Sequence, residues 1–550
     1  MKHFLFEFFL LFFLAITLRA QDASSAQAPP QKSLSDLLVQ GLQAYRTGKF
    51  DAAIESYQTA LQHDPKSGEA YAGLARAYLK QEKVEAAYDT ASKGVAEVPE
   101  SLAAHTALGE VYFRQAKMGE SEKEFLRTVN TTHPEARAYL GLARLYDALS
   151  FHARAKTMLE KAHALDPDDP DIQGRWLRTV SRSERIKLLQ DYLAKPGNDD
   201  TDTRKRMQRS LSSLQEQEKV PQQSCKLVSE LTATQTDLKV MMTDPKHLHG
   251  YGLEVKVNGQ SGRLLLDTGA SGLLINKKMA ERAGIKPLTT TKIGGIGDSA
   301  ETEGYVGYAD SIKVGTLEFQ NCLIEVSEKR SVLDDDGLIG ADVFRDYLVV
   351  LDFPNQKLKL EELPKRPDEK EGTASLSTNS DNEEDSAATP EPHDPYVAPE
   401  MQSYTKIWRF GHFLLIPTTV ADLAPKKMFL IDTGFPTSQI SLEAAREVKR
   451  LYESNARIRG LSGSVKHVYT TSDIALEFGN LRKENDAITA FDLSKTSRYP
   501  GTEVSGILGI TALGFTAMKI DYRDGLVYFD YDKSHWRGIP LTDFSKGSKP

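Results

Sequence analysis

Two stretches of the sequence place an aspartate in the same setting. LLLDTGASGLLIN begins at Leu264, and FLIDTGFPTSQIS begins at Phe429. In each stretch an apolar run leads into Asp-Thr-Gly, and apolar residues follow. If Asp267 and Asp432 face each other, like charges at short range raise one pKa and lower the other, so the pair holds one proton between pH extremes. The ionised member can take a proton from water while the protonated member polarises a peptide carbonyl, without metal or cofactor.

Each aspartate is expected at the end of a strand that a hairpin delivers. LEVKVNG, from Leu253, alternates apolar and polar residues before SGRLLLDTG, and HFLLIPTTV, from His412, precedes KKMFLIDTG. Such alternation predicts strands. Gly269 and Gly434 would let backbone N–H groups approach the carboxylates, where a Cβ would crowd them.

The surroundings of the two aspartates continue to match downstream. A helix-like segment comes first, then a glycine-rich hairpin, then an apolar-apolar-glycine segment, and then a closing hairpin. The helix-like segments are 277–284 and 441–451, the glycine-rich hairpins 293–307 and 458–470, and the apolar-apolar-glycine segments 336–344 and 505–513. Asp352 and Asp521 recur in the closing hairpins, where we expect them to accept hydrogen bonds from backbone donors.

These elements resemble those of the pepsin-like and retroviral-type aspartic proteases over residues 245–535. The resemblance implies an all-β fold of two lobes, with Asp267 and Asp432 as the catalytic pair and an extended peptide bound between the lobes. It implies that the hydroxyls of Thr268 and Thr433 cross-link the two loops through hydrogen bonds to the opposite backbone. It also implies flaps that fold over the substrate and exclude water. The flap candidates are Gly294, Gly295, Gly297, Gly460 and Gly463.

The residue after each Asp-Thr-Gly departs from the pepsin-like pattern, in which Ser or Thr donates to the carboxylate. Ala270 takes that place in the first loop, as in the retroviral type, and Phe435, followed by Pro436, takes it in the second. The Phe-Pro pair is unusual in both types. Loss of a donor to the ionised form predicts activity at less acidic pH. It also leaves a second function open, that of a catalytically silent protein that binds peptides through the same cleft.

The N-terminal half repeats with a period of 34 residues. Small residues recur at Gly41, Ala75, Gly109 and Ala143, and prolines close the units at Pro65, Pro99, Pro134 and Pro167. This pattern resembles the tetratricopeptide repeat, over residues 37–168, and implies stacked helix pairs whose concave face binds a peptide or protein partner. The alternative for this half is a spacer that holds the next domain away from a surface.

The ends and composition bound the location and the partners. The 550 residues are 40% hydrophobic and 27% charged, with a net charge of −8 and no long basic run. We therefore expect no nucleic-acid partner. Lys2, the apolar run from Phe8 to Leu18 and the small residue Ala20 predict a signal peptide and export to the periplasm or the extracellular space. An uncleaved N-terminal membrane anchor is the alternative; no second apolar stretch is long enough to span a membrane.

The residues that could hold a metal or form a disulfide are few. Cys225 and Cys322 form either one bridge or two unpaired thiols, which the sequence leaves open. His247 and His249 have no acidic or cysteine partner at a suitable spacing, so we expect an exposed loop there and neither a metal nor a cofactor in the protein.

The sequence thus predicts a multidomain protein, with an all-α tetratricopeptide solenoid followed by an all-β bilobal aspartic-protease-like region. The predicted divisions are a signal peptide (1–20), a flexible lead-in (21–33), the helical repeats (34–175), a helical cap or linker (176–221), lobe 1 (222–364), an acidic disordered linker that tethers the lobes (365–400) and lobe 2 (401–545). The predicted function is an exported aspartic endopeptidase that acts on a peptide or protein substrate recruited by the solenoid.

Overall fold

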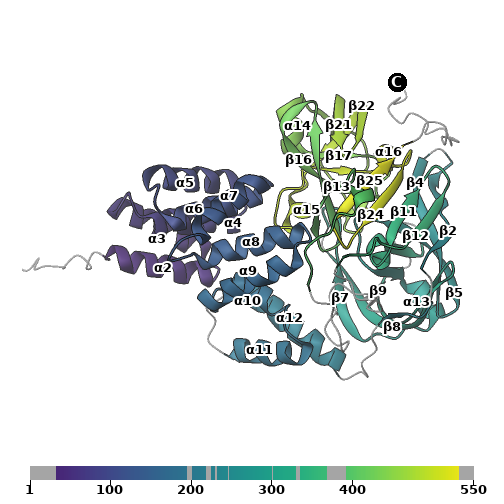
Figure 1. Ribbon diagram of the computed structural model, residues 1–550, viewed down its shortest axis with the longest axis horizontal. Coiled ribbons are helices and arrows are strands. Elements are labelled where there is room, and N and C mark those ends of the chain that lie inside the picture. The colour runs from purple at the N-terminus through teal and green to yellow at the C-terminus, as the bar shows by residue number, and fades with distance from the viewer. Residues whose placement is uncertain are drawn as a thin grey trace, which may run out of the picture.

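The computed structural model describes residues 32–194, 201–218, 225–229, 232–245, 247–299, 301–329, 335–367 and 392–531. A helical solenoid is followed by a β-rich region of two lobes (Figure 1). The predicted fold class, an all-α repeat solenoid followed by an all-β bilobal region, is confirmed. The predicted signal peptide lies outside the described residues, as do most of the lead-in and most of the acidic linker.

The solenoid is a series of helix pairs joined by short turns. Its helices are α2 (Leu34–Arg46), α3 (Phe50–His63), α4 (Gly68–Lys80), α5 (Val84–Glu97), α6 (Leu102–Arg114), α7 (Met118–Val129), α8 (Ala136–Ala148) and α9 (His152–Leu165). The recurring small residues lie where helices cross. A Cβ on Gly41 would lie 2.7 Å from the Tyr57 ring, and one on Gly109 would lie 2.7 Å from the Phe125 ring. Glycine at these positions lets an aromatic ring rest on the backbone of the neighbouring helix, which explains why the small residues keep the repeat period.

Three further helices follow the repeats. They are α10 (Pro170–Trp176), α11 (Arg182–Ala194) and α12 (Thr201–Glu218). α11 and α12 pack on each other through an apolar cluster that includes Ile186, Leu189, Met207 and Leu211.

Basic side chains on the first helices of the repeats pair with acidic residues around the start of α10. Arg137 on α8 and Lys80 on α4 both reach Asp171, at 3.1 and 3.0 Å. Arg46, the last residue of α2, reaches Asp166 at 3.0 Å. These ion pairs connect the first repeat to the residues after the fourth. Acidic residues of the chain itself therefore pair with the basic side chains on the solenoid face that the first helices of the repeats line.

Lobes 1 and 2 are built on the same plan. Lobe 1 contains β1 (Lys226–Leu227), β3 (Lys239–Asp244), β4 (His247–Val257), β5 (Gln260–Asp267), β6 (Leu273–Asn276), α13 (Lys277–Ala283), β7 (Thr289–Ile293), β8 (Thr302–Val314), β9 (Leu317–Ser327), β10 (Gly337–Gly340) and the 3-10 helix η1 (Ala341–Phe344). Lobe 2 contains β14 (Trp408–Phe410), β15 (Phe413–Val420), β16 (Leu423–Ile431), β17 (Gln439–Ser441), α14 (Leu442–Val448), β18 (Tyr452–Glu453), β19 (Arg459–Gly460), β20 (Gly463–Ser464), β21 (Tyr469–Phe478), β22 (Leu481–Phe491), α15 (Ser494–Arg498), β23 (Gly506–Leu508) and α16 (Ile510–Leu513), with η2 (Pro399–Met401) before it. The predicted hairpins are β4–β5 and β15–β16. Asn258 and Gly259 form the first turn with positive φ angles of 47° and 79°, as a tight hairpin turn requires.

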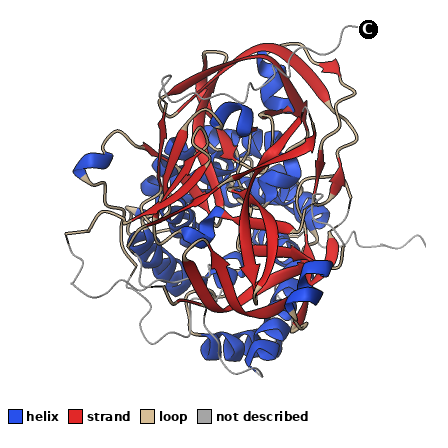
Figure 2. Cartoon of the chain, turned by 90° about the vertical axis from the view of Figure 1, so that its right-hand side faces the viewer, coloured by secondary structure: helices blue, strands red, loops and turns tan. Residues whose placement is uncertain are grey.

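A shared sheet joins the two lobes. It has the strand order β13-β25-β24-β11-β12-β2, with β2 (Thr234–Asp237), β11 (Leu348–Asp352), β12 (Lys357–Glu361), β13 (Thr405–Lys406), β24 (Ala517–Asp521) and β25 (Leu526–Asp530). β11 of lobe 1 pairs antiparallel with β24 of lobe 2. The predicted acceptor role of the two closing-hairpin aspartates is confirmed, because Asp352 accepts from the backbone N–H of Asn355 at 3.2 Å and Asp521 from that of Asp524 at 3.0 Å. Figure 2 shows the strands of both lobes in front of the helices.

The described ends of the acidic linker meet on lobe 2. The Arg366 guanidinium donates to the carbonyl of Asp394 and forms an ion pair with Asp524 at 3.5 Å. The backbone N–H of Tyr396 donates to the same Asp524 carboxylate at 2.8 Å. The residues that flank 368–391 thus lie together on lobe 2, and the tether role of the linker stays a prediction. Composition predicts how a segment behaves but not where its ends lie.

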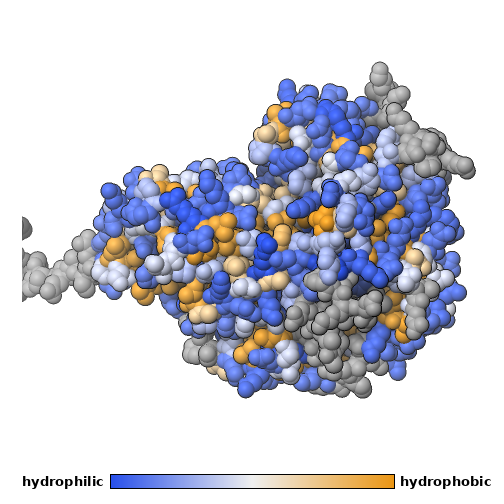
Figure 3. Space-filling view, in the orientation of Figure 1, coloured by the Kyte–Doolittle hydropathy of each residue, from blue (hydrophilic) through white to orange (hydrophobic). Residues whose placement is uncertain are grey.

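The solenoid packs directly against lobe 2. The Phe113 and Phe410 rings meet edge to face with centroids 6.2 Å apart. Around them, apolar residues of α6 to α8 share one buried cluster with strands of lobe 2. The solenoid therefore lies in direct contact with lobe 2, and the surface seen in Figure 3 continues from one to the other.

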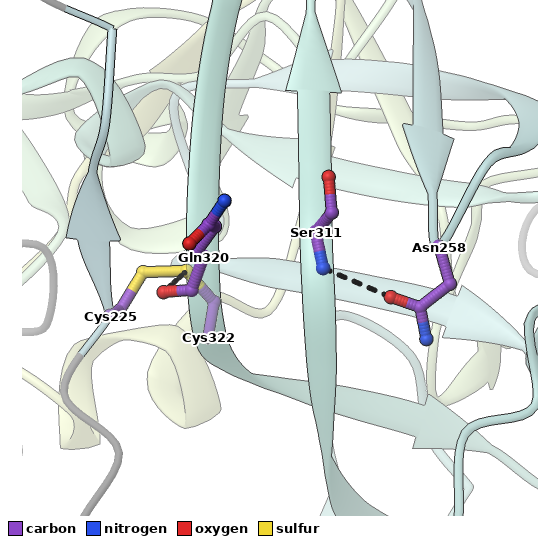
Figure 4. The surroundings of a disulfide bond; sticks show 5 residues. All are labelled: Cys225, Asn258, Ser311, Gln320 and Cys322. Atoms are coloured by element: carbon purple, nitrogen blue, oxygen red, sulfur yellow. Dashed lines mark hydrogen bonds between the residues drawn. A yellow bond between two sulfur atoms is a disulfide. The ribbon is translucent and has the colours of Figure 1, made fainter.

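Cys225 and Cys322 form a disulfide (Figure 4). Cys225 precedes β1, whose two residues pair antiparallel with β9, and Cys322 lies on β9. The bridge therefore fastens the start of lobe 1 to its own sheet. Of the two alternatives that the sequence leaves open, the bridge is the one present.

Candidate active site

Asp267 is the last residue of β5, and Asp432 directly follows β16. β5 runs parallel to β10, with Asp267 opposite Gly340, and β16 runs parallel to β23, with the backbone N–H of Asp432 donating to Leu508 at 3.1 Å. A Cβ on Gly340 would lie 2.6 Å from the Ala270 carbonyl oxygen. Gly340 and Gly509, the central glycines of the apolar-apolar-glycine segments, thus pass in contact with the backbone of the aspartate loops, where a Cβ would clash.

The structure brings Asp267 and Asp432 together. The backbone N–H of Gly269 donates to Asp267 Oδ1 at 2.7 Å, and that of Gly434 donates to Asp432 Oδ1 at 2.9 Å. A Cβ on Gly269 would lie 2.6 Å from the Asp432 carboxylate, and one on Gly434 would lie 2.6 Å from that of Asp267. Each loop glycine therefore makes room for the carboxylate of the other lobe.

Burial and mutual proximity favour protonation of the pair. Burial raises the pKa of Asp432 well above its usual range, and the neighbouring Asp267 carboxylate adds to that rise. Burial also raises the pKa of Asp267, although hydrogen bonds from Gly269 and Gly434 oppose it. The prediction that one pKa falls is wrong for this pair, because burial outweighs the hydrogen bonds at Asp267. Both pKa values are thus shifted toward the protonated form of the carboxyl group.

The predicted threonine cross-link is present between the two loops. Thr268 Oγ1 donates to the Ile431 carbonyl at 2.8 Å and accepts from the Thr433 N–H at 3.1 Å. Thr433 Oγ1 donates to the Leu266 carbonyl at 2.8 Å and accepts from the Thr268 N–H at 3.1 Å. Both threonines are 1% exposed. Four buried hydrogen bonds therefore fix the two aspartate loops relative to each other.

The flap candidates from the two lobes meet each other. Gly294, Gly295 and Gly297 follow β7, and Gly460 and Gly463 belong to the β19–β20 hairpin. The Ser462 N–H donates to the Ile296 carbonyl at 3.1 Å, the Ser299 N–H donates to the Ser462 carbonyl at 2.9 Å, and the Gly295 N–H donates to Ser462 Oγ at 3.1 Å.

Each flap tip reaches apolar residues that belong to the other lobe. Leu461 packs against the lobe 1 cluster that also receives Ala270, and Ile296 packs against the cluster that also receives Phe435. Ala270 and Phe435, which stand where pepsin-like enzymes have a hydroxyl donor, thus pack on the same clusters as the flap tips. The contact residues Ile296, Leu461 and Ser462 were not among the predicted flap residues, although their place between the glycines is a sequence signal for a hairpin tip.

The described residues contain no cluster of three or more histidine, cysteine, aspartate or glutamate side chains placed to bind a metal. His247 and His249 lie at the start of β4 and not in a loop, and His249 is 3.8 Å from Asp335. Over the same part of the chain, none of the helices has both the length and the apolar character that crossing a membrane requires.

Comparison with known families agrees with this architecture. An aspartyl protease model matches residues 253–343, and tetratricopeptide repeat models match residues 44–111 and 136–169. The chain therefore combines tetratricopeptide repeats with an aspartyl protease domain.

Individual relatives match parts of the chain. The DNA damage-inducible protein 1 of Neurospora crassa is 28% identical over 187 residues, which are 33% of this chain and 38% of the relative. That of Chaetomium globosum is 33% identical over 113 residues, 20% of this chain and 24% of the relative. The chain thus spans well under half the length of these relatives. A crystal structure of a thermophilic tetratricopeptide protein of Thermus thermophilus is 25% identical, covers 33% of this chain and 100% of its own, and has a TM-score of 0.27.

Proposed function

We propose that the protein is an aspartic endopeptidase whose catalytic pair is Asp267 and Asp432. The observation that carries the proposal is the fit of each carboxylate against the loop glycine of the opposite lobe, within a cross-link of four buried hydrogen bonds. Such rigid placement of reacting groups is what catalysis by positioning needs. No cofactor or metal enters the proposed reaction.

The pair acts through one shared proton. The ionised carboxylate takes a proton from a water molecule as the water oxygen attacks the peptide carbonyl carbon. The protonated carboxyl gives its proton to the carbonyl oxygen, so a neutral tetrahedral diol forms. When the C–N bond breaks, the nitrogen receives a proton from one carboxyl and the diol returns one to the other. Amide and water are thus converted to acid and amine, and the pair regains its starting state.

The test is cleavage of a mixed peptide library from about pH 3 to 8 by the wild type, Asp267→Asn and Asp432→Asn. Cleavage that both substitutions abolish supports the proposal. The exposed aspartate Asp310 on β8 offers a matched control, and Asp310→Asn should leave the rate unchanged. Absence of cleavage by the wild type at every pH contradicts the proposal.

The second candidate function is a catalytically silent peptide binder, and Phe435 is the observation that favours it. Its side chain stands where pepsin-like enzymes have a donor to the carboxylate. A peptide carrying a tetrahedral hydroxyl centre in place of the scissile bond separates the two functions. Tight binding of this peptide without cleavage of the parent peptide supports the silent binder.

Recruitment by the solenoid and export complete the proposal. A peptide that docks on the face lined by the first helices would meet side chains already paired with Asp166 and Asp171. Exposed apolar residues on α2, Val39 at 65% and Leu42 at 44%, offer further contact area, and apolar patches are visible on the solenoid in Figure 3. Recruitment predicts that Val39→Asp together with Leu42→Asp raises KM for a folded protein substrate but not for a short peptide.

Export is supported by the N-terminal sequence and by the disulfide, because disulfides persist in oxidising compartments. Cell fractionation combined with thiol alkylation tests it. A protein in the periplasmic or extracellular fraction with both cysteines protected from alkylation agrees with export. Recovery in the membrane fraction favours the N-terminal anchor, and reduced cysteines in the cytoplasmic fraction contradict export.

A further inference from the structure

A short segment of lobe 2 contacts both the solenoid and the first flap. It runs from Asp492 to Val504, contains α15 and is called the bracket segment here. It directly precedes Ser505 and β23, the strand that passes beside the Asp432 loop. The bracket segment therefore lies between the site and the repeats.

On one side, the bracket segment is fastened to the solenoid. Thr502 Oγ1 donates to the Phe113 carbonyl at 2.6 Å, and the Glu503 N–H donates to the Arg114 carbonyl at 2.9 Å. Thr502 is 0% exposed. Both acceptors lie at the end of α6. The Phe113 carbonyl also accepts from the Ala116 N–H at 3.1 Å, so lobe 2 adds to the hydrogen bonds that this helix end receives from its own turn.

A second contact supports the same junction nearer the solvent. Arg498, the last residue of α15, forms an ion pair with Glu82 in the turn between α4 and α5 at 2.6 Å. The side chains are 58% and 42% exposed, so this pair adds little to stability by itself. Its geometry nevertheless places α15 against two successive repeats.

On the other side, the bracket segment holds the first flap. Lys495 Nζ donates to the Gly297 carbonyl at 3.1 Å. Gly297 is buried at the flap tip with a φ of 135°, and a Cβ there would lie 2.4 Å from the Ser462 carbonyl. The lysine thus binds the flap where the backbone of the first flap crosses that of the second.

We propose that Lys495 is a positioning residue that holds the first flap closed over the aspartate pair, and that the solenoid fixes the place from which it does so. This inference rests on the proposed peptidase function and adds a role for the repeats within it. If the C-terminal end of α6 shifts, the bracket segment should move with it. The Lys495 ammonium group that donates to the Gly297 carbonyl would then move as well.

The hydrogen bond from Lys495 to Gly297 is called the latch here. Removing it should leave the flap in place but more often open, because the contacts of Ser462 with the first flap remain. Lys495→Met keeps the aliphatic stem and removes the donor. One charge-assisted hydrogen bond at a partly exposed site predicts a rise in KM of about fivefold, with kcat within about twofold. The backbone amides of residues 293–299 should exchange with deuterium faster by a similar factor.

Two variants show whether the effect belongs to the hydrogen bond. Lys495→Arg retains a cationic donor and should restore KM and slow exchange. Lys426→Met removes an exposed lysine on β16 of the same lobe and should leave both unchanged. If the backbone amides of residues 293–299 exchange at the wild-type rate in Lys495→Met, the latch is excluded.

The solenoid part of the proposal is tested at Thr502. Thr502→Val removes the hydrogen bond to Phe113 and should speed exchange at 293–299 in the same direction as Lys495→Met, whereas Thr502→Ser should not. Thr502→Val with wild-type flap exchange and unchanged circular dichroism overturns the solenoid part alone. Flap exchange needs no substrate, so it decides the latch even where the wild type cleaves nothing and the peptidase proposal fails. The two proposals can also fail separately. If Asp432→Asn abolishes cleavage while Lys495→Met changes neither cleavage nor flap exchange, the peptidase proposal stands and the latch is excluded.

Discussion

Replacement of Thr268 by valine isolates the hydrogen bonds that join the two aspartate loops. Valine keeps the shape of threonine and removes its hydroxyl, so the Ile431 carbonyl and the Thr433 N–H lose their partners at 2.8 and 3.1 Å. Both groups are in a buried setting where Thr268 is 1% exposed. An unsatisfied buried polar group costs about 1–3 kcal/mol, so the expected loss in the free energy of unfolding is about 2–6 kcal/mol.

The assay is unfolding in urea followed by tryptophan fluorescence, with Thr268→Ser as the matched control. Serine retains the hydroxyl and loses one methyl group, which predicts a loss of about 1 kcal/mol. Thr433→Val should match Thr268→Val, because each threonine makes the same two bonds with the opposite lobe. The reasoning is refuted if the free energies of unfolding of Thr268→Val and Thr268→Ser differ by less than about 1 kcal/mol.

Three further predictions follow from single features of the β region. Gly434→Ala puts a methyl group 2.6 Å from the Asp267 carboxylate and should lower kcat about 100-fold by displacing it, whereas Gly119→Ala, with nothing within 4 Å, should leave kcat unchanged. Burial and the neighbouring Asp524 carboxylate raise the pKa of Asp521 to about 6. The protonated Asp521 carboxyl therefore contributes fully to the free energy of unfolding below about pH 4, and this contribution is lost as the pH rises through 6. Asp521→Asn, which stays neutral, should therefore gain about 3 kcal/mol over the wild type between pH 4 and 7 in urea unfolding, and equal pH profiles would contradict this. The disulfide between Cys225 and Cys322 closes a loop of sequence separation 97, so its reduction should lower the free energy of unfolding by about 4.7 kcal/mol in the same assay. A urea midpoint that reductant leaves unchanged would exclude a stabilising role.

The duplicated half of the molecule is largely predictable from sequence because its signals are local. The alternation before Asp267 predicts β4 and β5, and the Asn258–Gly259 pair marks their turn. The same pattern before Asp432 predicts the matching hairpin in lobe 2. The threonine cross-link is predictable only through resemblance, since it requires that two loops distant in sequence meet.

Contacts between segments without a shared pattern are not predictable in this way. Nothing near Phe113 indicates that the end of α6 receives hydrogen bonds from Thr502, because a repeat helix looks the same with or without a neighbour. The ion pairs of Asp171 with Lys80 and Arg137 likewise depend on the curvature of the whole solenoid. The flap tips were predicted from glycines, but the residues that make their contacts are the apolar and hydroxyl residues between those glycines.

The meeting of Arg366 and Asp394 on one turn of lobe 2 makes the chain connection between the lobes dispensable in principle. A peptide bond broken between residues 368 and 391 would produce two polypeptides, each with one aspartate of the pair. They would stay associated through the β11–β24 pairing and the threonine hydrogen bonds. A nicked molecule would then keep its activity until dilution or denaturant separated the two fragments, and recombining separately expressed fragments should restore it. The single chain would thus behave as a heterodimer whose two subunits happen to be synthesised as one.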